Sequence, residues 1–206
     1  MSQVITSKCK VCRRLGVKLF LKGERCLTKK CAVERKQTSS RGRRPRRMSE
    51  YGRQLREKQK LRYQYRLSEN QFAGLFHKAE RLSGVTSEDF LRLLERRLDN
   101  VVYRLGLCQS RGQARELVAH GHFQVNGRKV DIPSYLVKEG DVITPRPAGK
   151  KLALFKDNMA AAAKKDLPEW LGLDRSVVKG QVKRFPYAEE LVSDVDVSAI
   201  VEFYSK

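Results

Sequence analysis

The stretch LERRLDNVVYRLG, from Leu94 to Gly106, decides the fold together with SRGQAREL, which begins at Ser110. Apolar residues in the first stretch recur at helical spacing, and the same stripe extends back to a Thr86–Asp89 cap. We therefore expect one helix that ends at Gly106. Ser110 with Gln113 forms a capping box, which predicts the start of a second helix. The apolar stripes of these helices are interpreted as core and not as a cofactor site.

The residues that follow have the pattern of a small antiparallel sheet. Residues 122–132 read as a hairpin around Asn126-Gly127, a pair that supplies the two positive φ angles of a type I′ turn. Pro168 ends a predicted helix at Leu152–Lys165. Further short strands are predicted at Tyr135–Val137, Val142–Thr144, Trp170–Leu173 and Val177–Phe185.

Upstream, the chain has the pattern of a helical region. A helix is expected from about Ser49, and Ser68 with Gln71 forms another capping box, whose helix runs to Gly84. The final segment, 187–206, carries five acidic residues against one basic residue. We expect it to end in a helix that packs on the basic helical region or contacts another protein.

Four of the five cysteines form two pairs near the N-terminus, Cys9 with Cys12 and Cys26 with Cys31. Four thiolates complete a tetrahedral zinc site with no open position, so such a metal is structural. We expect Lys18–Leu21 and the turn Lys22–Glu24 to form a short hairpin that brings the second pair back to the first. Two disulfides, or four unrelated thiols, are the alternatives. Neighbouring cations are expected to favour the thiolates; they are Lys8, Lys10, Arg13 and Arg14.

Other features indicate the compartment of the protein. The N-terminal residues MSQVITSKCKVC contain no apolar core of a secretory signal, and no apolar run approaches the roughly 18 residues that span a bilayer. We therefore expect a cytoplasmic protein without membrane contact, whose cysteines are reduced. Cys108, which follows Leu105 and Leu107, is interpreted as a buried packing residue.

The charge of the chain indicates a polyanionic partner. Its 206 residues contain 44 Lys and Arg against 23 Asp and Glu, a formal net charge of +21. Residues 41–66 alone hold eleven basic residues and two acidic ones, too few to neutralise them. This imbalance favours nucleic acid over a solvated helix face. It argues against an enzyme with an acidic pocket or a neutral metabolic enzyme.

Together, these motifs resemble the bacterial small-subunit ribosomal protein S-four family. The likeness covers essentially the whole chain, and the cysteine pairs fit the zinc-bearing branch of that family. Two departures are Gln37–Gly42, where the family commonly has Pro-Gly-x-His-Gly, and Arg66, where glycine is usual. The motifs that carry the resemblance are 94–106, 110–115, VNG at 125–127, IPSY at 132–135, RQLREKQK at 53–60, QF at 71–72 and IVEFYSK at 200–206.

The resemblance implies an α+β fold and an rRNA-binding function. Family members are primary binders of small-subunit (16S) rRNA at a multi-helix junction of the 5′ body domain, and they nucleate subunit assembly. They also border the path along which mRNA enters, contact ribosomal protein S-five and influence translational accuracy. The expected domains are a zinc knuckle and basic extension over 1–48, a helical domain over 49–91 with 187–206 packed on it, and an S-four-type RNA-binding domain over 92–186.

The predicted RNA contacts combine charge with these motifs. RNA contact is favoured for Arg104, Arg111 and Arg115, and we expect the Arg111 side chain to be exposed. For Ser110 and Asn126, a cap or turn role is an equal alternative, and for His120 packing is an equal alternative. The predicted contact residues are Arg43, Arg44, Arg46, Arg47, Arg53, Arg56, Lys58, Lys60, Arg62, Arg97, Arg104, Ser110, Arg111, Gln113, Arg115, His120, Asn126, Arg128 and Lys129.

Two other function classes compete with this interpretation. An RNA-modifying enzyme that carries the same module needs a separate catalytic domain, yet the chain has no GxGxxG, GxxxxGK[ST], HExxH or GxSxG motif and only three histidines. We expect no enzyme activity and no small-molecule substrate. A DNA-binding zinc protein should place a helix in the major groove, whereas the knuckle is expected to have a turn-like interior.

Overall fold

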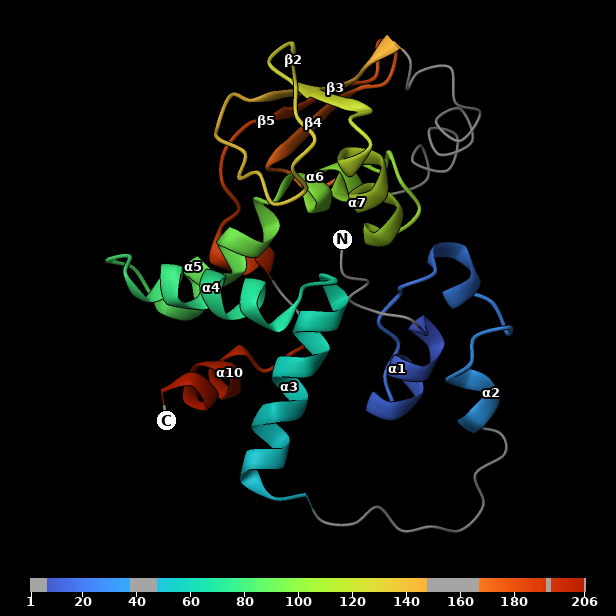
Figure 1. Ribbon diagram of the computed structural model, residues 1–206, viewed down its shortest axis with the longest axis vertical. Coiled ribbons are helices and arrows are strands. Elements are labelled where there is room, and N and C mark those ends of the chain that lie inside the picture. The colour runs from blue at the N-terminus through green and yellow to red at the C-terminus, as the bar shows by residue number, and fades with distance from the viewer. Residues whose placement is uncertain (1–6, 38–47, 148–166, 192–193, 206) are drawn as a thin grey trace. The chain divides into compact units, whose positions relative to one another are not determined.

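The computed structural model describes residues 7–37, 48–147, 167–191 and 194–205 (Figure 1). The chain divides into two compact units, one of residues 1–90 with 193–206 and one of residues 91–192. Among the described helices, none has the length and apolar character needed to cross a bilayer. The division into domains at residues 48/49 and 91/92 stays a prediction.

The first unit consists of helices. Serine side chains cap two of them: Ser68 Oγ accepts from Gln71 N, as predicted, and Ser49 Oγ accepts from Gly52 N at the expected start of α3. The helix after Ser68 ends at Glu80, earlier than the predicted Gly84. The described elements are α1 (Lys8–Leu15), η1 (Gly23–Cys26), α2 (Glu34–Gln37), α3 (Glu50–Gln64), α4 (Glu69–Glu80), α5 (Thr86–Glu95, which continues into the second unit) and α10 (Val197–Tyr204).

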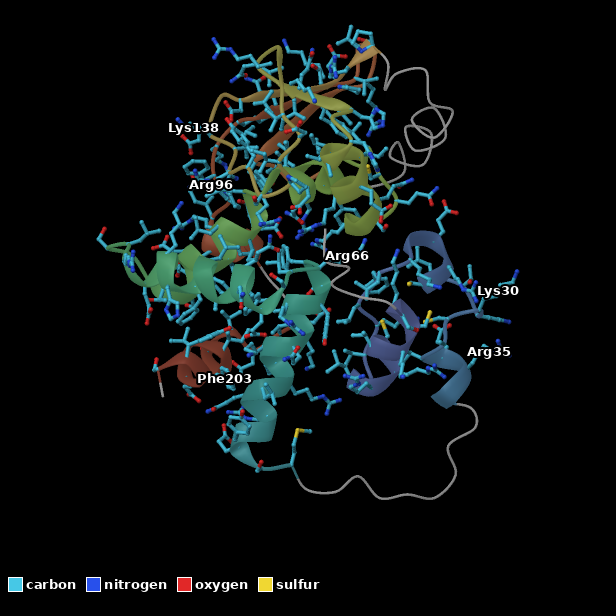
Figure 2. All side chains as sticks on the ribbon, in the orientation of Figure 1. Lys30, Arg35, Arg66, Arg96, Lys138 and Phe203 are labelled. Carbon is cyan, nitrogen blue, oxygen red and sulfur yellow. The ribbon has the colours of Figure 1, made fainter. Side chains whose placement is uncertain are left out.

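The C-terminal helix α10 packs on α3. Phe203 of α10 lies against α3 (Figure 2), with Lys58 Nζ 4.3 Å from the centre of its ring. Gln54 Nε2 donates to Glu202 Oε2 at 2.9 Å. Tyr204 stacks on Phe76 of α4 with ring centroids 4.5 Å apart. The acidic end of the chain is therefore held by both an aromatic contact and polar contacts.

The cysteine region differs from the prediction. Cys9 and Cys12 lie on α1, and the expected hairpin over Lys18–Glu24 does not form. The reason is the apolar spacing: Val11, Cys12 and Leu15 share one buried helical face. That face packs with Leu19, Leu21, Cys31 and Val33. A small apolar cluster, and not strand pairing, shapes this segment.

The second unit packs helices against an antiparallel sheet, which confirms the predicted α+β class. The sheet order is β2-β1-β3-β5-β4. Leu98 of α6, Val118 of α7 and Phe123 of β1 are fully buried in one core. The elements are α6 (Leu98–Arg104), α7 (Arg111–Ala119), β1 (Phe123–Val125), β2 (Arg128–Lys129), β3 (Val142–Pro145), β4 (Leu171–Asp174), β5 (Lys179–Val182) and η2 (Ala188–Leu191).

The predicted single helix up to Gly106 is wrong, because the chain breaks between α5 and α6. Arg97 has extended backbone angles, φ −66° and ψ 136°. Leu98 N donates to Tyr135 O at 2.8 Å, and Val137 N donates to Arg96 O at 2.9 Å. The predicted strand at Tyr135–Val137 is thus reduced to one bridge, between Arg97 and Leu136. The helix predicted at 152–165 lies outside the described residues.

The Asn126-Gly127 turn is confirmed. Their φ angles are 49° and 79°, as a type I′ turn requires. The Asn126 side chain also joins β3, since its Nδ2 donates to Asp141 Oδ1 at 2.8 Å and its Oδ1 accepts from Val142 N at 2.9 Å. These bonds show that Asn126 has the predicted role in the turn; its other predicted role, contact with RNA, stays a prediction.

A first prediction concerns Gly180 of β5, where the sheet meets α6. A Cβ at this position would lie 2.4 Å from Cδ1 of Leu105, which is only 1% exposed and has little room to move. We expect Gly180→Ala to destabilise the protein by about 1–3 kcal/mol in urea unfolding. The control is Gly74→Ala in α4, where no atom lies within 4 Å, and this variant should be about 0.5–1 kcal/mol more stable. Equal effects of the two substitutions would contradict this account of Gly180.

Candidate nucleic-acid interface

The start of α7 is held by reciprocal side-chain caps. Ser110 Oγ accepts from Gln113 N at 3.3 Å, and Gln113 Oε1 accepts from Gln109 N at 2.8 Å. Ser110 is 8% exposed. Both predicted contact residues therefore fix the first turn of α7, which presents the positive end of the helix dipole.

A buried polar network joins α5, α6 and α7. We call it the Glu95 network, and it consists of Glu95, Asn100, Arg104 and Arg111. Arg104 donates to the Glu95 carboxylate from Nε at 2.9 Å and from Nη2 at 2.7 Å. Asn100 Nδ2 donates to Glu95 Oε2 at 2.9 Å, while Asn100 Oδ1 accepts from Arg111 Nε at 2.8 Å. One carboxylate thus organises two of the three arginines for which RNA contact was favoured.

The expectation that Arg111 is exposed is wrong. Its side chain is 11% exposed, and its guanidinium lies over the ring of Tyr103, 4.7 Å from the ring centre. Stacking and the bond to Asn100 explain this burial. Arg104, with a side chain 36% exposed, is the more accessible member of the network.

Arg97 and Asp99 form a second buried contact. Arg97 donates from Nε at 3.1 Å and from Nη2 at 2.8 Å to the two oxygens of Asp99. Their side chains are 2% and 6% exposed. Arg115, with 26% exposure, adds an ion pair to Asp99 at 3.6 Å. The guanidinium of Arg97 is therefore used inside the fold, while that of Arg115 reaches the surface.

The β1–β2 turn carries exposed cations. Arg128 and Lys129 are both exposed, and Lys129 Nζ lies 3.0 Å from Asp131 Oδ2. The bond from Lys129 lowers the pKa of Asp131 below its usual value. His120, at the end of α7, is exposed, with its ring 6.3 Å from that of His122. This edge of the second unit offers donors to an anion.

The predicted contacts on α3 already have partners within the first unit. Lys58 is buried and lies 2.6 Å from Glu69. The other four are less buried. Arg53 pairs with Glu50 and Asp196, and Lys60 pairs with Glu57. Arg56 donates to the backbone oxygen of Leu15, while Arg62 pairs with Glu69 and lies over the Tyr63 ring. Arg43, Arg44, Arg46 and Arg47 lie outside the described residues.

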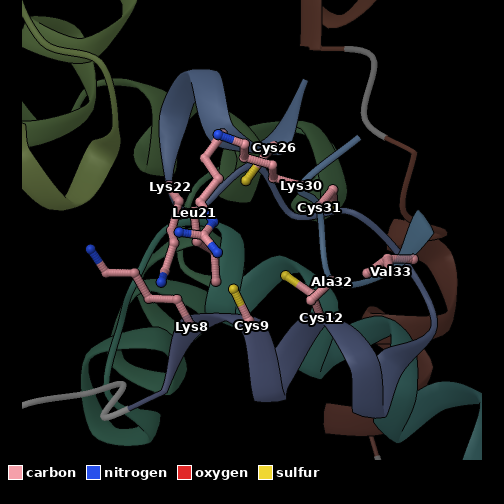
Figure 3. A pocket seen from close by; sticks show the side chains of 11 residues that line it. Lys8, Cys9, Cys12, Leu21, Lys22, Cys26, Lys30, Cys31, Ala32 and Val33 are labelled. Atoms are coloured by element: carbon pink, nitrogen blue, oxygen red, sulfur yellow. The ribbon is translucent and has the colours of Figure 1, made fainter. Parts of the chain in front are cut away.

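The four N-terminal cysteines line one pocket. Figure 3 shows Cys9 and Cys12 on α1 facing Cys26, and Cys31 completes the lining. All four are free of disulfides, so that alternative finds no support. Within the described ranges, no three His, Cys, Asp or Glu side chains are close enough together to hold a metal ion. The donor chemistry fits zinc, but the side-chain positions do not form a finished metal centre.

The expected effect of nearby cations on the thiols is wrong for Cys12. Burial raises its pKa, and the charges of the other three thiols add to this effect, against a hydrogen bond with the backbone of Leu19. The thiol of Cys108 behaves as predicted for a packing residue. It is 1% exposed, and burial raises its pKa to about 12.

Sequence reasoning missed Glu95, Asp99 and Asn100 as organising residues. Each lies inside the quoted motif 94–106, but none of them is among the predicted site residues. Asp99 and Asn100 interrupt an apolar stripe between Leu98 and Val101. That interruption is the signal that could have identified buried polar residues with dedicated partners.

The fold and these charged surfaces define an RNA-binding module with a helical N-terminal part. Residues 96–143 match the family described as the S4 domain, and residues 3–95 match the family described as the ribosomal protein S4/S9 N-terminal domain.

The chain belongs to the ribosomal protein S4 family. It is 49% identical, over the full length of both chains, to small ribosomal subunit protein uS4 of Thermodesulfovibrio yellowstonii. It is 48% identical over the full length to the protein of that name from Pelobacter propionicus, and 49% identical to that from Pelotomaculum thermopropionicum. This is a family of ribosomal structural proteins, so the prediction that the chain is not an enzyme is confirmed. The relatives' name also agrees with the predicted ribosomal localisation.

A second prediction separates internal arginines from surface ones. Arg97→Ala leaves Asp99 buried without its bidentate partner, so we expect a loss of about 3–5 kcal/mol in the free energy of unfolding. The control is Arg128→Ala on exposed β2, which should change stability by less than about 0.5 kcal/mol. Comparable unfolding curves for the two variants would show that Arg97 is not a structural residue.

Proposed function

We propose that this chain is a structural constituent of the small ribosomal subunit that binds small-subunit (16S) rRNA in the cytoplasm. The observation that carries the proposal is full-length identity of 49% to proteins named small ribosomal subunit protein uS4. The net charge of +21 supports it, because so large an excess suits a polyanionic partner.

We propose further that the rRNA site is a multi-helix junction of the 5′ body domain and that binding nucleates subunit assembly. Cations on the described surfaces are spread over α3, the end of α6, α7 and the β1–β2 turn. The deep, narrow major groove of an A-form helix excludes side chains, so such surfaces recognise phosphates, 2′-hydroxyls and junction shape. A folded junction offers several phosphate chains at once, which suits dispersed cations better than one straight duplex.

The remaining parts of the proposal rest on the family resemblance. The chain would border the path along which mRNA enters the subunit, influence translational accuracy and contact ribosomal protein S-five. The basic tract at residues 41–47 supplies unneutralised charge for such nucleic-acid contacts.

We also propose that Cys9, Cys12, Cys26 and Cys31 hold a structural zinc ion. Their support is the shared pocket, the absence of disulfides among them and a donor set of four sulfurs. The cluster of Val11, Leu15, Leu19, Leu21 and Val33 beside them is small, so a bound metal would supply folding energy that this segment otherwise lacks.

A third prediction tests the rRNA proposal by salt dependence. The full chain should bind a transcript of the rRNA 5′ domain more tightly than duplex DNA of equal length at the same salt. If on the order of eight phosphates are neutralised, the logarithm of the association constant should fall with the logarithm of salt concentration at a slope of roughly 6–7. Filter binding between about 50 and 200 mM salt measures this slope. Equal affinity for duplex DNA, or a slope near zero, would contradict the proposal.

A fourth prediction tests the zinc proposal. The purified chain should contain one zinc ion, and chelation should expose residues 8–33 to protease while α4–α7 stay protected, because the metal's binding energy is local folding energy. Cys12→Ser should lose the metal, whereas Cys108→Ser, outside the pocket, should keep it. If the chain is purified without zinc, and its protease cleavage pattern does not change when a chelator is added, the proposal of a structural zinc ion is refuted.

A further inference from the structure

Glu95 is an unexpected residue in a surface that is proposed to bind RNA. A carboxylate repels phosphate, so a cationic interface would gain charge complementarity if this position were neutral. Glu95 is nevertheless 3% exposed, accepts from Asn100 and Arg104 of α6, and lies 4.0 Å from Arg111 of α7. Its position indicates that the negative charge serves the arginines around it.

The bonds of the Glu95 network fix the geometry of Arg104. Its guanidinium makes two bonds to Glu95, through Nε and Nη2, which holds the plane of the group. The side chain retains 36% exposure, so an anion can approach a guanidinium whose orientation is already fixed.

The same carboxylate acts on Arg111 through Asn100. Asn100 is 1% exposed and donates Nδ2 both to Glu95 Oε2, at 2.9 Å, and to the Glu95 backbone oxygen, at 3.0 Å. These bonds turn Asn100 Oδ1 toward Arg111 Nε, at 2.8 Å. Arg111 Nη2 also lies 4.0 Å from Glu95 Oε1. Both arginines are therefore oriented by one buried group.

We propose that Glu95 is a positioning residue for RNA binding, which holds Arg104 directly and Arg111 through Asn100 in the orientation that receives RNA phosphates. The inference rests on the proposed rRNA-binding function. Because the arginines are ordered before RNA arrives, binding loses less side-chain freedom. A rigid pair of guanidinium groups also favours one spacing of phosphates and so contributes to selection of a folded RNA.

The experiment compares Glu95→Gln with Glu116→Gln, measuring affinity of the full chain for the rRNA 5′-domain transcript. Both substitutions remove one negative charge from the second unit, but Glu116 is exposed on α7. The proposal predicts that Glu95→Gln weakens binding about tenfold and lowers the salt slope by about 1, as expected when one arginine disengages. Glu116→Gln should bind as well as the unmodified chain or more tightly. A merely electrostatic role for Glu95 predicts the opposite sign, and tighter binding by Glu95→Gln would overturn the proposal.

A double-mutant cycle separates positioning from general support of the fold. If Glu95 acts through Arg104, then Glu95→Gln should have a much smaller effect on RNA affinity in a chain that already carries Arg104→Gln than in the unmodified chain. An equal effect in both backgrounds would overturn the positioning role. All affinities are measured at a temperature at which circular dichroism shows each variant fully folded.

Arg104→Lys keeps the inference testable if Glu95→Gln does not fold. Lysine keeps the charge but cannot make two parallel bonds to the carboxylate, so binding should weaken. The control Arg175→Lys, at an exposed site in the turn between β4 and β5, should leave affinity within about twofold. Equal affinities of the two lysine variants would overturn the inference alone. Failure of the folded, unmodified chain to bind the transcript would overturn the proposed function as well.

Discussion

The buried pair of Arg97 and Asp99 is the interaction on which the second unit depends. It lies where α5 ends and α6 begins, at a residue whose extended backbone bridges to Leu136. The break directs α6 onto the sheet, and Glu95 and Asn100 lie on either side of it. Buried charges are tolerated because each has a bidentate or multiple partner. The pair therefore links the backbone course to the placement of the surface arginines.

Buried and half-buried carboxylates organise part of the excess positive charge. Glu95 orients Arg104, Asp99 orients Arg97 and contacts Arg115, and Glu69 neutralises Lys58 beneath α10. These three carboxylates therefore fix the positions of cations within each unit. Such an arrangement suits a protein that recognises the shape of a folded polyanion, because fixed cations discriminate between spacings of phosphates whereas mobile ones do not.

Local signals made much of the fold predictable. The serine caps before α4 and α7 could be predicted because each bond closes within three residues, and Asn126-Gly127 specifies its turn through backbone φ angles alone. The break at Arg97 was not readable, since it depends on pairing with residues almost forty positions later. The burial of Arg111 also depends on tertiary packing, because its partners Asn100 and Tyr103 lie on the preceding helix. The pattern of α7 alone therefore could not predict it. For the cysteine region, the helical spacing of Val11, Cys12 and Leu15 was present in the sequence but was overlooked beside the C-x-x-C motif.

The central claim is that the cations of this chain recognise one folded region of small-subunit rRNA. A hydroxyl-radical protection map of the full-length rRNA with the purified chain tests it most directly. The account predicts that protected nucleotides come from several helices and converge on one junction of the 5′ domain. Protections scattered over unrelated duplex segments, or none at moderate ionic strength, would contradict it.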